Sequence, residues 1–255
     1  MTPEKKLLRQ SFGRAAPHYD DVADLQRDVG TRLMTFCAIE NVPARVLDAG
    51  CGTGHGLQLI ASRWPQAKII ALDFSAPMVK RIASPDAIAV CGDMEALPLA
   101  AKSIDLLWSS LALQWCDAAQ VAREAQRVLQ GGGHLVASTL GPATFAELRR
   151  AFVGVDNFQH TNDFLDVDAV RRALVDGGLT PVSVQRVELV RHYADLRSLL
   201  ASVRDLGANR VAASNRRRGL MGKAAWRRFA ANFERMRAPS GLPLTYDACF
   251  LVARK

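Results

Sequence analysis

The sequence has few aromatic residues and no long apolar run. Aromatic residues make up 7% of its 255 residues, which is little for stacking on the bases of RNA. No apolar run approaches the roughly 18 residues that are needed to span a membrane. The first residues, MTPEKKLLRQSF, carry charges and lack the apolar stretch of a secretory signal. We therefore expect a cytoplasmic protein.

Paired cysteines are also missing. No C-x-x-C pair occurs, and the five cysteines are scattered singly: Cys37, Cys51, Cys91, Cys116 and Cys249. An odd number of isolated cysteines indicates reduced thiols in a cytosolic protein. We expect neither a disulfide framework nor a metal site.

The formal net charge of +8 is concentrated near the C-terminal end. Residues 171–255 hold 17 Lys or Arg and 6 Asp or Glu, a net charge of +11, whereas residues 1–170 have a net charge of −3. Such a region attracts an anionic partner, which on charge alone can be a nucleic acid, a membrane surface or an acidic protein. The alternative is that these arginines only keep the surface solvated.

Apolar segments alternate with helical patterns along most of the chain, and 49% of the residues are hydrophobic. We expect strands at 45–50, 68–73, 87–93, 104–110, 134–140, 182–193 and 244–254. We expect helices within 1–40, at 54–63, 75–84 and 117–129, within 142–178, and at 194–206 and 222–237. Apolar strands alternating with helices predict an α/β domain with a mostly parallel sheet covered on both faces, and the two late strands predict an antiparallel edge.

The stretch LDAGCGTGHG, residues 47–56, places four glycines directly behind the first expected strand. Ligands of open α/β sheets bind at this end of the strands, and glycine lets the backbone approach them closely. A dinucleotide fingerprint would need glycine where His55 stands, and the Gly-Lys-Ser/Thr of a phosphate-binding loop is missing. Both of these nucleotide sites are therefore excluded.

The acidic residue followed by G-x-G-x-G resembles the first motif of class I S-adenosylmethionine (SAM) methyltransferases. Asp73 ends the second strand, where this superfamily places a carboxylate on the ribose hydroxyls. Asp93 and Met94 follow the third strand, where it contacts adenine, and LALQW (111–115) follows the fourth, near the methyl group. The resemblance implies a seven-stranded Rossmann-like fold and these cofactor-binding residues: Asp48, Gly50, Cys51, Gly52, Gly54, Asp73, Phe74, Met78, Asp93, Met94, Leu111 and Gln114.

Motifs at both ends of the chain resemble the malonyl-[acyl-carrier protein] O-methyltransferases of biotin synthesis. They are F-x-x-A-A-x-x-Y-D (12–20), R-x-G-L-x-G (217–222) and GLPLTYD-x-x-F (241–250). The resemblance implies SAM-dependent methylation of the free carboxylate of malonyl on an acyl carrier protein, or of malonyl-CoA, with S-adenosylhomocysteine as the other product. Because carrier proteins are acidic, we expect the basic region to meet such a partner, and neither nucleic acid nor membrane.

The same resemblance suggests one domain in three parts. We expect a helical lid at 1–40, a SAM-binding core at 41–141, and a lobe at 142–255 that faces substrate and partner. The lobe's helices, near 142–178 and 194–237, are expected to lie over the sheet.

A carboxylate is already a nucleophile at neutral pH, so the reaction needs no general base. It needs a clamp that desolvates and aligns the carboxylate, for which the candidates are Tyr19, Arg149 and His192. Each also has a structural alternative, as a packed tyrosine, a solvated arginine and a surface histidine. The candidates for contact with the carrier protein are Arg216, Arg217, Arg218, Lys223, Arg227 and Arg228.

Other functions remain open at this point. One is methylation of a quinone precursor or another small molecule, with the basic region on an anionic membrane surface. A second is RNA modification, and a third is a non-methylating assembly factor that uses the SAM fold for another purpose.

Overall fold

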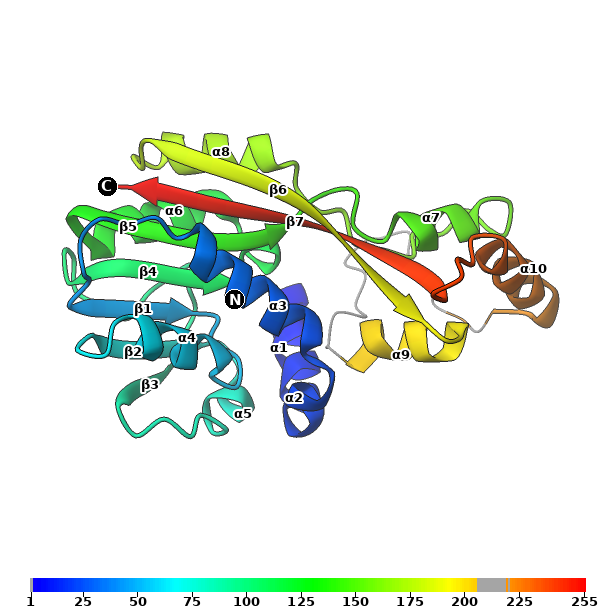
Figure 1. The fold of residues 1–255 in the computed structure, drawn as a ribbon, viewed down its shortest axis with the longest axis horizontal. Helices are drawn as coiled ribbons and strands as arrows, with labels where there is room; N and C mark the ends of the chain where they lie inside the picture. The colour runs from blue at the N-terminus through cyan, green and yellow to red at the C-terminus, as the bar shows by residue number, and fades with distance from the viewer. Residues whose placement is uncertain (1, 206–218, 220) are drawn as a thin grey trace.

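The computed structural model describes residues 2–205, 219 and 221–255. Its centre is a seven-stranded sheet in the order β3-β2-β1-β4-β5-β7-β6, with β7 antiparallel to both neighbours (Figure 1). The strands are β1 (Arg45–Ala49), β2 (Lys68–Asp73), β3 (Ala87–Cys91), β4 (Ile104–Ser110), β5 (Leu129–Leu140), β6 (Val182–Tyr193) and β7 (Leu242–Arg254). This confirms the predicted α/β fold class, including the antiparallel last strand.

Helices cover both faces of the sheet. The α-helices are α1 (Pro3–Ala15), α2 (Tyr19–Val22), α3 (Asp24–Phe36), α4 (His55–Arg63), α5 (Ala76–Val79), α6 (Ala118–Val128), α7 (Ala146–Phe152), α8 (Val167–Asp176), α9 (Leu196–Asp205) and α10 (Lys223–Glu234), with short 3₁₀ turns at Ala16–His18 and Leu113–Trp115. Successive strand residues point to opposite faces, so Val46 packs in the cluster with α3 and α4, and Leu47 in the cluster with α6 and α8. No helix among the described residues is long and apolar enough to cross a membrane.

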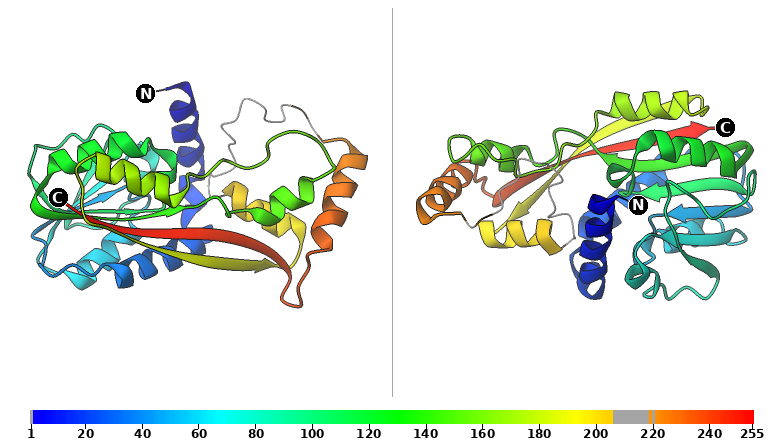
Figure 2. Two further views of the ribbon diagram at one scale, coloured as in Figure 1. Left: turned by 90° about the horizontal axis from the view of Figure 1, so that it is seen from above. Right: turned by 180° about the vertical axis from the view of Figure 1, so that it is seen from behind.

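Strands β6 and β7 pair along their whole lengths, from Val182↔Ala253 to Tyr193↔Leu242. Figures 1 and 2 show this long ribbon running past the rest of the sheet and carrying α7, α9 and α10 at its far end. The prediction that these helices lie over the sheet is therefore right only in part. α7 packs on β7, α9 packs on β6 and β7, and α10 packs on α7 at the far end of the ribbon, whereas α8 packs on α6, β6 and β7. The alternation of apolar and polar residues predicts which side of a strand is buried, but it does not predict how far the strand extends beyond its neighbours in the sheet.

Several element boundaries also differ from the prediction. The glycines at 131–133 lie inside β5 instead of ending the preceding helix, at a place where the pairing of β4 with β5 shifts register. A bulge tolerates glycine, and Gly132 has a φ of +81° there. The helix expected at 75–84 is only α5, and the strand expected at 87–93 ends at Cys91.

The N-terminal helices stand at the carboxyl ends of the parallel strands, between the sheet and the lobe (Figure 2). Phe12 of α1 makes edge contacts with Phe74, which follows β2, and with Trp115, which follows β4. Helix α1 is thus held over the edge of the sheet where α/β proteins bind ligands.

Candidate active site

The glycine turn follows β1 at the point where the strand order reverses, since β1 lies between β2 and β4. Gly50, Gly52 and Gly54 have φ angles of +78°, +55° and +102°, which glycine adopts without strain. A Cβ at Gly50 would also collide with the Cβ of Ala112, after β4. The turn therefore needs glycine both for its conformation and for its close approach to the neighbouring loop.

The first cavity at this edge encloses about 610 Å³ including its opening to solvent, and we call it the adenosyl cavity after the cofactor part expected there. Its lining residues are Lys5, Phe12, Tyr19, Gly50, Gly52, Leu72, Asp73, Phe74, Met78, Gly92, Asp93, Met94, Ser110, Leu111, Ala112, Trp115 and Cys116. Asp73 is buried, and its carboxylate accepts hydrogen bonds from the backbone N–H groups of Gly52 (3.0 Å) and Ser75 (2.8 Å). Burial raises the pKa of Asp73, and these two hydrogen bonds oppose the rise.

A second cavity, the polar cavity, lies on the other side of the glycine turn and encloses about 530 Å³. Its lining includes Asp48, His55, Trp108, Gln26 and Arg27. Within the described part of the chain, four buried polar atoms around it have no hydrogen-bond partner: Asp48 Oδ2, His55 Nε2, Trp108 Nε1 and Gln26 Oε1. Buried polar groups are normally paired, so this concentration fits a polar ligand.

Burial, with a smaller contribution from Asp73, raises the pKa of Asp48 to about 8. Burial, then the positive charge of Arg27, lowers the pKa of His55. Near neutral pH the cavity therefore holds a neutral imidazole and a carboxyl group close to its titration point.

A third cavity lies between the N-terminal helices and the near end of the lobe and encloses about 530 Å³. We call it the acyl cavity, after the ligand proposed for it below. Its lining residues are Phe12, Tyr19, Leu25, Gln26, Leu111, Gln114, Trp115, Leu140, Phe145, Phe164, Val203 and Tyr246. Most of them are apolar, in contrast to the polar cavity.

Tyr19 lines all three cavities. Its ring atom Cε1 lies 3.7 Å from the position that a Cβ on Gly52 would occupy. Burial, and then the charges of Asp73 and Asp20, raise the pKa of the phenol above its ordinary value. Tyr19 is therefore a hydrogen-bond donor at neutral pH and not a base.

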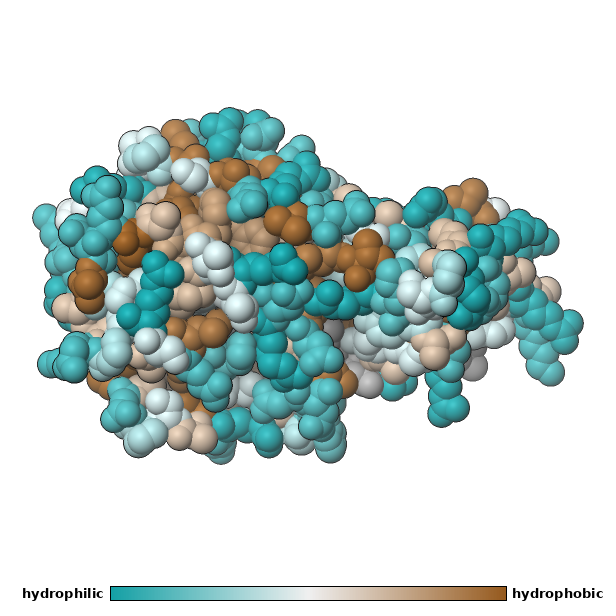
Figure 3. All heavy atoms as spheres, viewed as in Figure 1, coloured by the Kyte–Doolittle hydropathy of each residue, from teal (hydrophilic) through white to brown (hydrophobic). Residues whose placement is uncertain are grey.

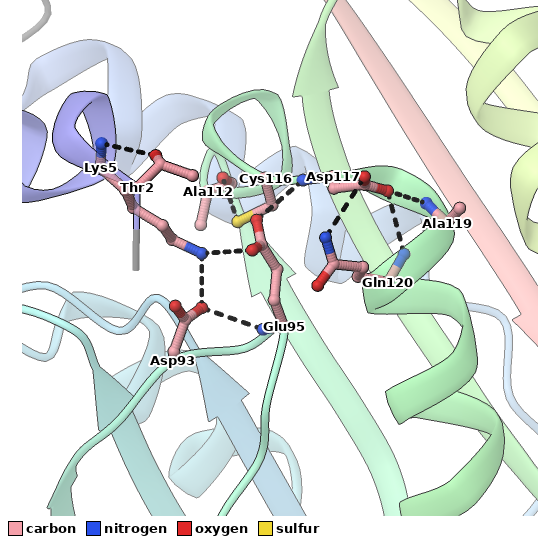
Figure 4. A network of polar contacts seen from close by, with 9 residues as sticks. All are labelled: Thr2, Lys5, Asp93, Glu95, Ala112, Cys116, Asp117, Ala119 and Gln120. Carbon is pink, nitrogen blue, oxygen red and sulfur yellow. Dashed lines mark hydrogen bonds and ion pairs between the residues drawn. The ribbon is translucent and has the colours of Figure 1, made fainter.

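An ion-pair network joins the N-terminal helix to the adenosyl cavity (Figure 4). Lys5 Nζ lies 2.7 Å from Asp93 Oδ1 and 2.7 Å from Glu95 Oε2, and the Lys5 side chain is only 10% exposed. Glu95 also accepts a hydrogen bond from the backbone N–H of Asp117 (2.8 Å), the N-cap of α6. Lys5 thus ties α1 to the loop after β3, and Glu95 joins that loop to the start of α6.

Most of the predicted cofactor residues line the adenosyl cavity. Asp48 and Cys51 instead line the polar cavity, and Gln114 lines the acyl cavity. Gly54 is the N-cap of α4 and lines none of these three cavities. The sequence motifs therefore converge on one edge of the sheet but divide among three compartments there.

Two of the predicted clamp residues lie elsewhere. The Arg149 guanidinium donates to the carbonyl oxygens of Thr144 (2.5 Å) and Pro142 (2.7 Å), and Arg149 lines none of the three cavities. His192 is exposed on β6, opposite Pro243. Arg149 holds the turn before α7, and neither Arg149 nor His192 lines these cavities.

Of the predicted partner residues, Lys223, Arg227 and Arg228 are exposed on α10 at the far end of the lobe. Arg228 donates to the carbonyl oxygen of Gly154 (2.8 Å). Arg216, Arg217 and Arg218 lie outside the described residues.

Sequence reasoning missed Lys5, Arg27, His55 and Phe145 as cavity-lining residues. The GLPLTYD motif contains Tyr246, so it is the one sequence signal that includes this residue of the acyl cavity wall. No comparable pattern marks Lys5 or Arg27, which are two of many charged residues on amphipathic helices.

Comparisons with known proteins agree with this geometry. The methyltransferase domain family matches residues 47–137. A malonyl-[acyl-carrier protein] O-methyltransferase from Dechloromonas aromatica is 44% identical over 253 residues, covering 99% of this chain and 95% of the relative. The biotin biosynthesis bifunctional protein BioHC of Cellvibrio japonicus is 38% identical over 99% of this chain, which matches half of that longer protein.

Among solved structures, the YcgJ protein of Bacillus subtilis superposes with a TM-score of 0.61 at 15% identity, covering 89% of this chain and 98% of that one. At this identity the likeness concerns the fold alone. The match to the Dechloromonas aromatica relative covers nearly the full length of both proteins, and its identity is high enough to show the family as well as the fold. The chain belongs to the malonyl-[acyl-carrier protein] O-methyltransferase family.

Proposed function

We propose that this chain transfers the methyl group of SAM to the free carboxylate of malonyl on an acyl carrier protein. The products are the malonyl methyl ester, a starting unit for pimeloyl synthesis in the biotin pathway, and S-adenosylhomocysteine. The observation that carries the proposal is the meeting of an adenosyl, a polar and an apolar cavity at Tyr19, in a chain of this family. The cytoplasmic location remains a prediction from the sequence.

The cavities suit the parts of SAM. Asp73 is the candidate partner of the ribose hydroxyls. For the adenine amino group the candidate acceptor is Asp93. Lys5 and the backbone N–H of Glu95 both donate to its Oδ1, so Oδ2 is the oxygen proposed to accept from adenine. The methionine tail, with an ammonium and a carboxylate, suits the polar cavity, where Asp48 offers an unpaired acceptor and Arg27 a cation.

SAM supplies an electrophilic methyl group: the carboxylate oxygen forms the new O–C bond as the S–C bond breaks, and sulfur keeps the electron pair. No proton moves, so the chain has only to align the two partners and exclude water. Tyr19 is suited to orient the carboxylate, because its protonated hydroxyl is a donor at the junction of the cavities. Phe12 and Trp115 exclude water from the same junction.

The exposed face of α10 is the candidate contact for the carrier protein. Lys223 and Arg227 are four residues apart on this helix and share a face. Trp226 beside them is 44% exposed, so cations surround an apolar anchor. In Figure 3 the far end of the lobe presents mainly hydrophilic side chains. Such a surface suits an acidic partner.

The test is to incubate the purified protein with SAM and, separately, malonyl-carrier protein, malonyl-CoA, a demethylquinone and tRNA, and to measure product masses. We expect a methyl ester on the malonyl substrates alone. Methylation of the quinone or the tRNA with no change in the malonyl substrates would refute the proposal. Unmethylated products throughout, with SAM bound, would instead favour a non-methylating factor.

A further inference from the structure

The acyl cavity opens onto the reaction centre. It shares Phe12, Tyr19, Leu111 and Trp115 with the adenosyl cavity, and Tyr19 and Gln26 with the polar cavity. A ligand in the acyl cavity can therefore reach a group held at the junction of the other two.

The polar groups of the acyl cavity are neutral. Among the described residues that line it, none is charged. Gln114 donates to the carbonyl oxygen of Leu111 (2.7 Å), and its own side-chain oxygen lies 3.4 Å from the hydroxyl of Thr139. Gln26 has a buried oxygen without a partner among the described residues. A further donor is the hydroxyl of Tyr19, which is protonated because burial raises its pKa, whereas the hydroxyl of Tyr246 is engaged by Tyr193 and Ser202.

The wall of this cavity is built with backbone strain. Leu111 and Phe145 have φ angles of +50° and +63°, a region that residues other than glycine rarely adopt and that clusters at functional sites. The segment that carries Phe145 is held by buried groups. Glu147 accepts hydrogen bonds from the backbone N–H (2.9 Å) and the hydroxyl (2.6 Å) of Thr245, and the backbone N–H of Asp247 donates to the hydroxyl of Thr144 (3.0 Å).

Aromatic contacts fix the position of Phe145 in this wall. The ring of Phe145 packs edge-on against Tyr246, with centroids 5.3 Å apart, and against Phe164, with centroids 6.1 Å apart. Such a cavity suits a short acyl chain.

We propose that the acyl cavity binds the malonyl group, and that the counter-ion of its carboxylate is the positively charged sulfur of SAM instead of a cationic side chain. This inference rests on the proposed function. A carboxylate in an apolar cavity is strongly disfavoured unless it is paired. The neutral donors orient it, and the sulfonium at the junction supplies the opposite charge at short range, where the low dielectric strengthens the attraction.

The arrangement has consequences for rate and order of binding. Both charges decrease as the methyl group moves, so a surrounding of neutral groups favours the transition state over the separated ions. A fixed arginine would instead stabilise the ground-state carboxylate. The malonyl substrate should bind tightly to the SAM complex and poorly to the S-adenosylhomocysteine complex. The methyl ester has lost the carboxylate charge, so its affinity should not depend on the charge of the cofactor.

The test measures binding without turnover. The protein is saturated either with sinefungin, an unreactive SAM analogue with an amine cation near the position of the sulfonium, or with neutral S-adenosylhomocysteine. The Kd of malonyl-carrier protein is then measured in both states by calorimetry. We expect at least tenfold tighter binding with sinefungin. The methyl ester of the same carrier protein is the matched control and should differ less than twofold between the two states.

A Kd that is equal in both states overturns the inference, because a protein cation, including one from residues 206–218, binds the carboxylate whatever the charge of the cofactor. If methyl transfer to malonyl proceeds while the Kd values are equal, the proposed function stands and only this inference fails. If malonyl-carrier protein neither binds nor is methylated, both fail.

A variant tests the role of the neutral donors. Gln114→Leu removes one donor and keeps an apolar wall, so it should weaken malonyl binding severalfold in both states and leave the ratio between them above tenfold. Loss of the ratio in this variant would mean that the orientation of Gln114, and not the cofactor charge, produces it.

Discussion

Asp48 is a carboxyl group of the site whose charge changes near neutral pH. Burial raises its pKa to about 8, and its Oδ2 is unpaired within the described part of the chain. If the ammonium of the methionine tail binds the ionised form, SAM binding below pH 8 must release a proton. The affinity for SAM should then fall as pH is lowered from 8 to 6, by up to about tenfold per pH unit, and level off above 8.

Calorimetry across this range, in two buffers of different ionisation enthalpy, measures both the affinity and the released proton. Asp48→Asn keeps the shape of the side chain and should remove this proton release. A wild-type affinity that is flat between pH 6 and 8 would contradict the assignment of the polar cavity to the tail.

Tyr19 allows a second prediction at the scale of one residue. Its hydroxyl lies at the junction of the cavities, whereas its ring packs near Gly52. Tyr19→Phe should lower kcat for malonyl-carrier protein roughly 10-fold or more and leave the Kd of SAM unchanged, because only the donor is lost. The Kd of SAM, measured on the same variant, is the control for an intact cofactor site. An unchanged kcat would assign Tyr19 a packing role.

Among the structural elements, α1 is held at the adenosyl cavity by one polar and one aromatic side chain. Lys5 bridges Asp93 and Glu95, and Phe12 packs on Phe74 and Trp115. Release of S-adenosylhomocysteine requires this helix to move if it acts as a lid. Lys5→Met keeps the aliphatic stem and removes the two ion pairs, so we expect product release to be several times faster and the Kd of S-adenosylhomocysteine to rise.

Stopped-flow measurement of the dissociation rate provides the check. Lys6→Met, an exposed neighbour on the same helix, should leave the rate unchanged. Equal rates for wild type and Lys5→Met would show that the network does not limit opening of the site.

The elements also show how far sequence reasoning extends. Every strand of the sheet was predicted within a few residues, because apolar runs and glycine turns are local signals. The glycine turn was predicted for the same reason, since Gly50, Gly52 and Gly54 are needed for their own backbone angles. The position of the lobe and the role of Lys5 depend instead on which distant segments meet, as in the contact between residues 5 and 93. No local pattern encodes such a contact.

Arg149 illustrates the same limit. Its place in TFAELRRAF suggested a carboxylate clamp, but the guanidinium instead satisfies backbone carbonyls of the turn that leads into its own helix. The turn presents Phe145 to the acyl cavity, so Arg149 supports the cavity wall without entering it.

At the scale of the whole molecule, the charge asymmetry bears on how the carrier protein is recruited. Lys223 and Arg227 lie on the exposed face of α10, at the end of the β6–β7 ribbon and away from the helices that cover the sheet (Figure 1). An acidic partner is steered towards such a surface, and the effect fades with salt as the Debye length falls from about 10 Å at 0.1 M to about 3 Å at 1 M. We therefore expect Lys223→Glu with Arg227→Glu to raise the KM for malonyl-carrier protein at low salt, and this difference from wild type to shrink at 1 M salt.

The control carries the same change of charge at another place. Arg171 and Arg172 are exposed on α8, which covers the sheet, so Arg171→Glu with Arg172→Glu changes the net charge equally but leaves α10 unchanged. The deciding quantity is the ratio of kcat/KM for malonyl-carrier protein to kcat/KM for malonyl-CoA. Because CoA also carries anionic phosphates, the difference between the two substrates is smaller than it would be for a neutral thioester. A specific docking surface lowers this ratio in the α10 pair alone. An equal fall in both pairs would assign the effect to net charge, and an unchanged ratio in the α10 pair, with its fold intact by circular dichroism, would mean that these cations only solvate the lobe.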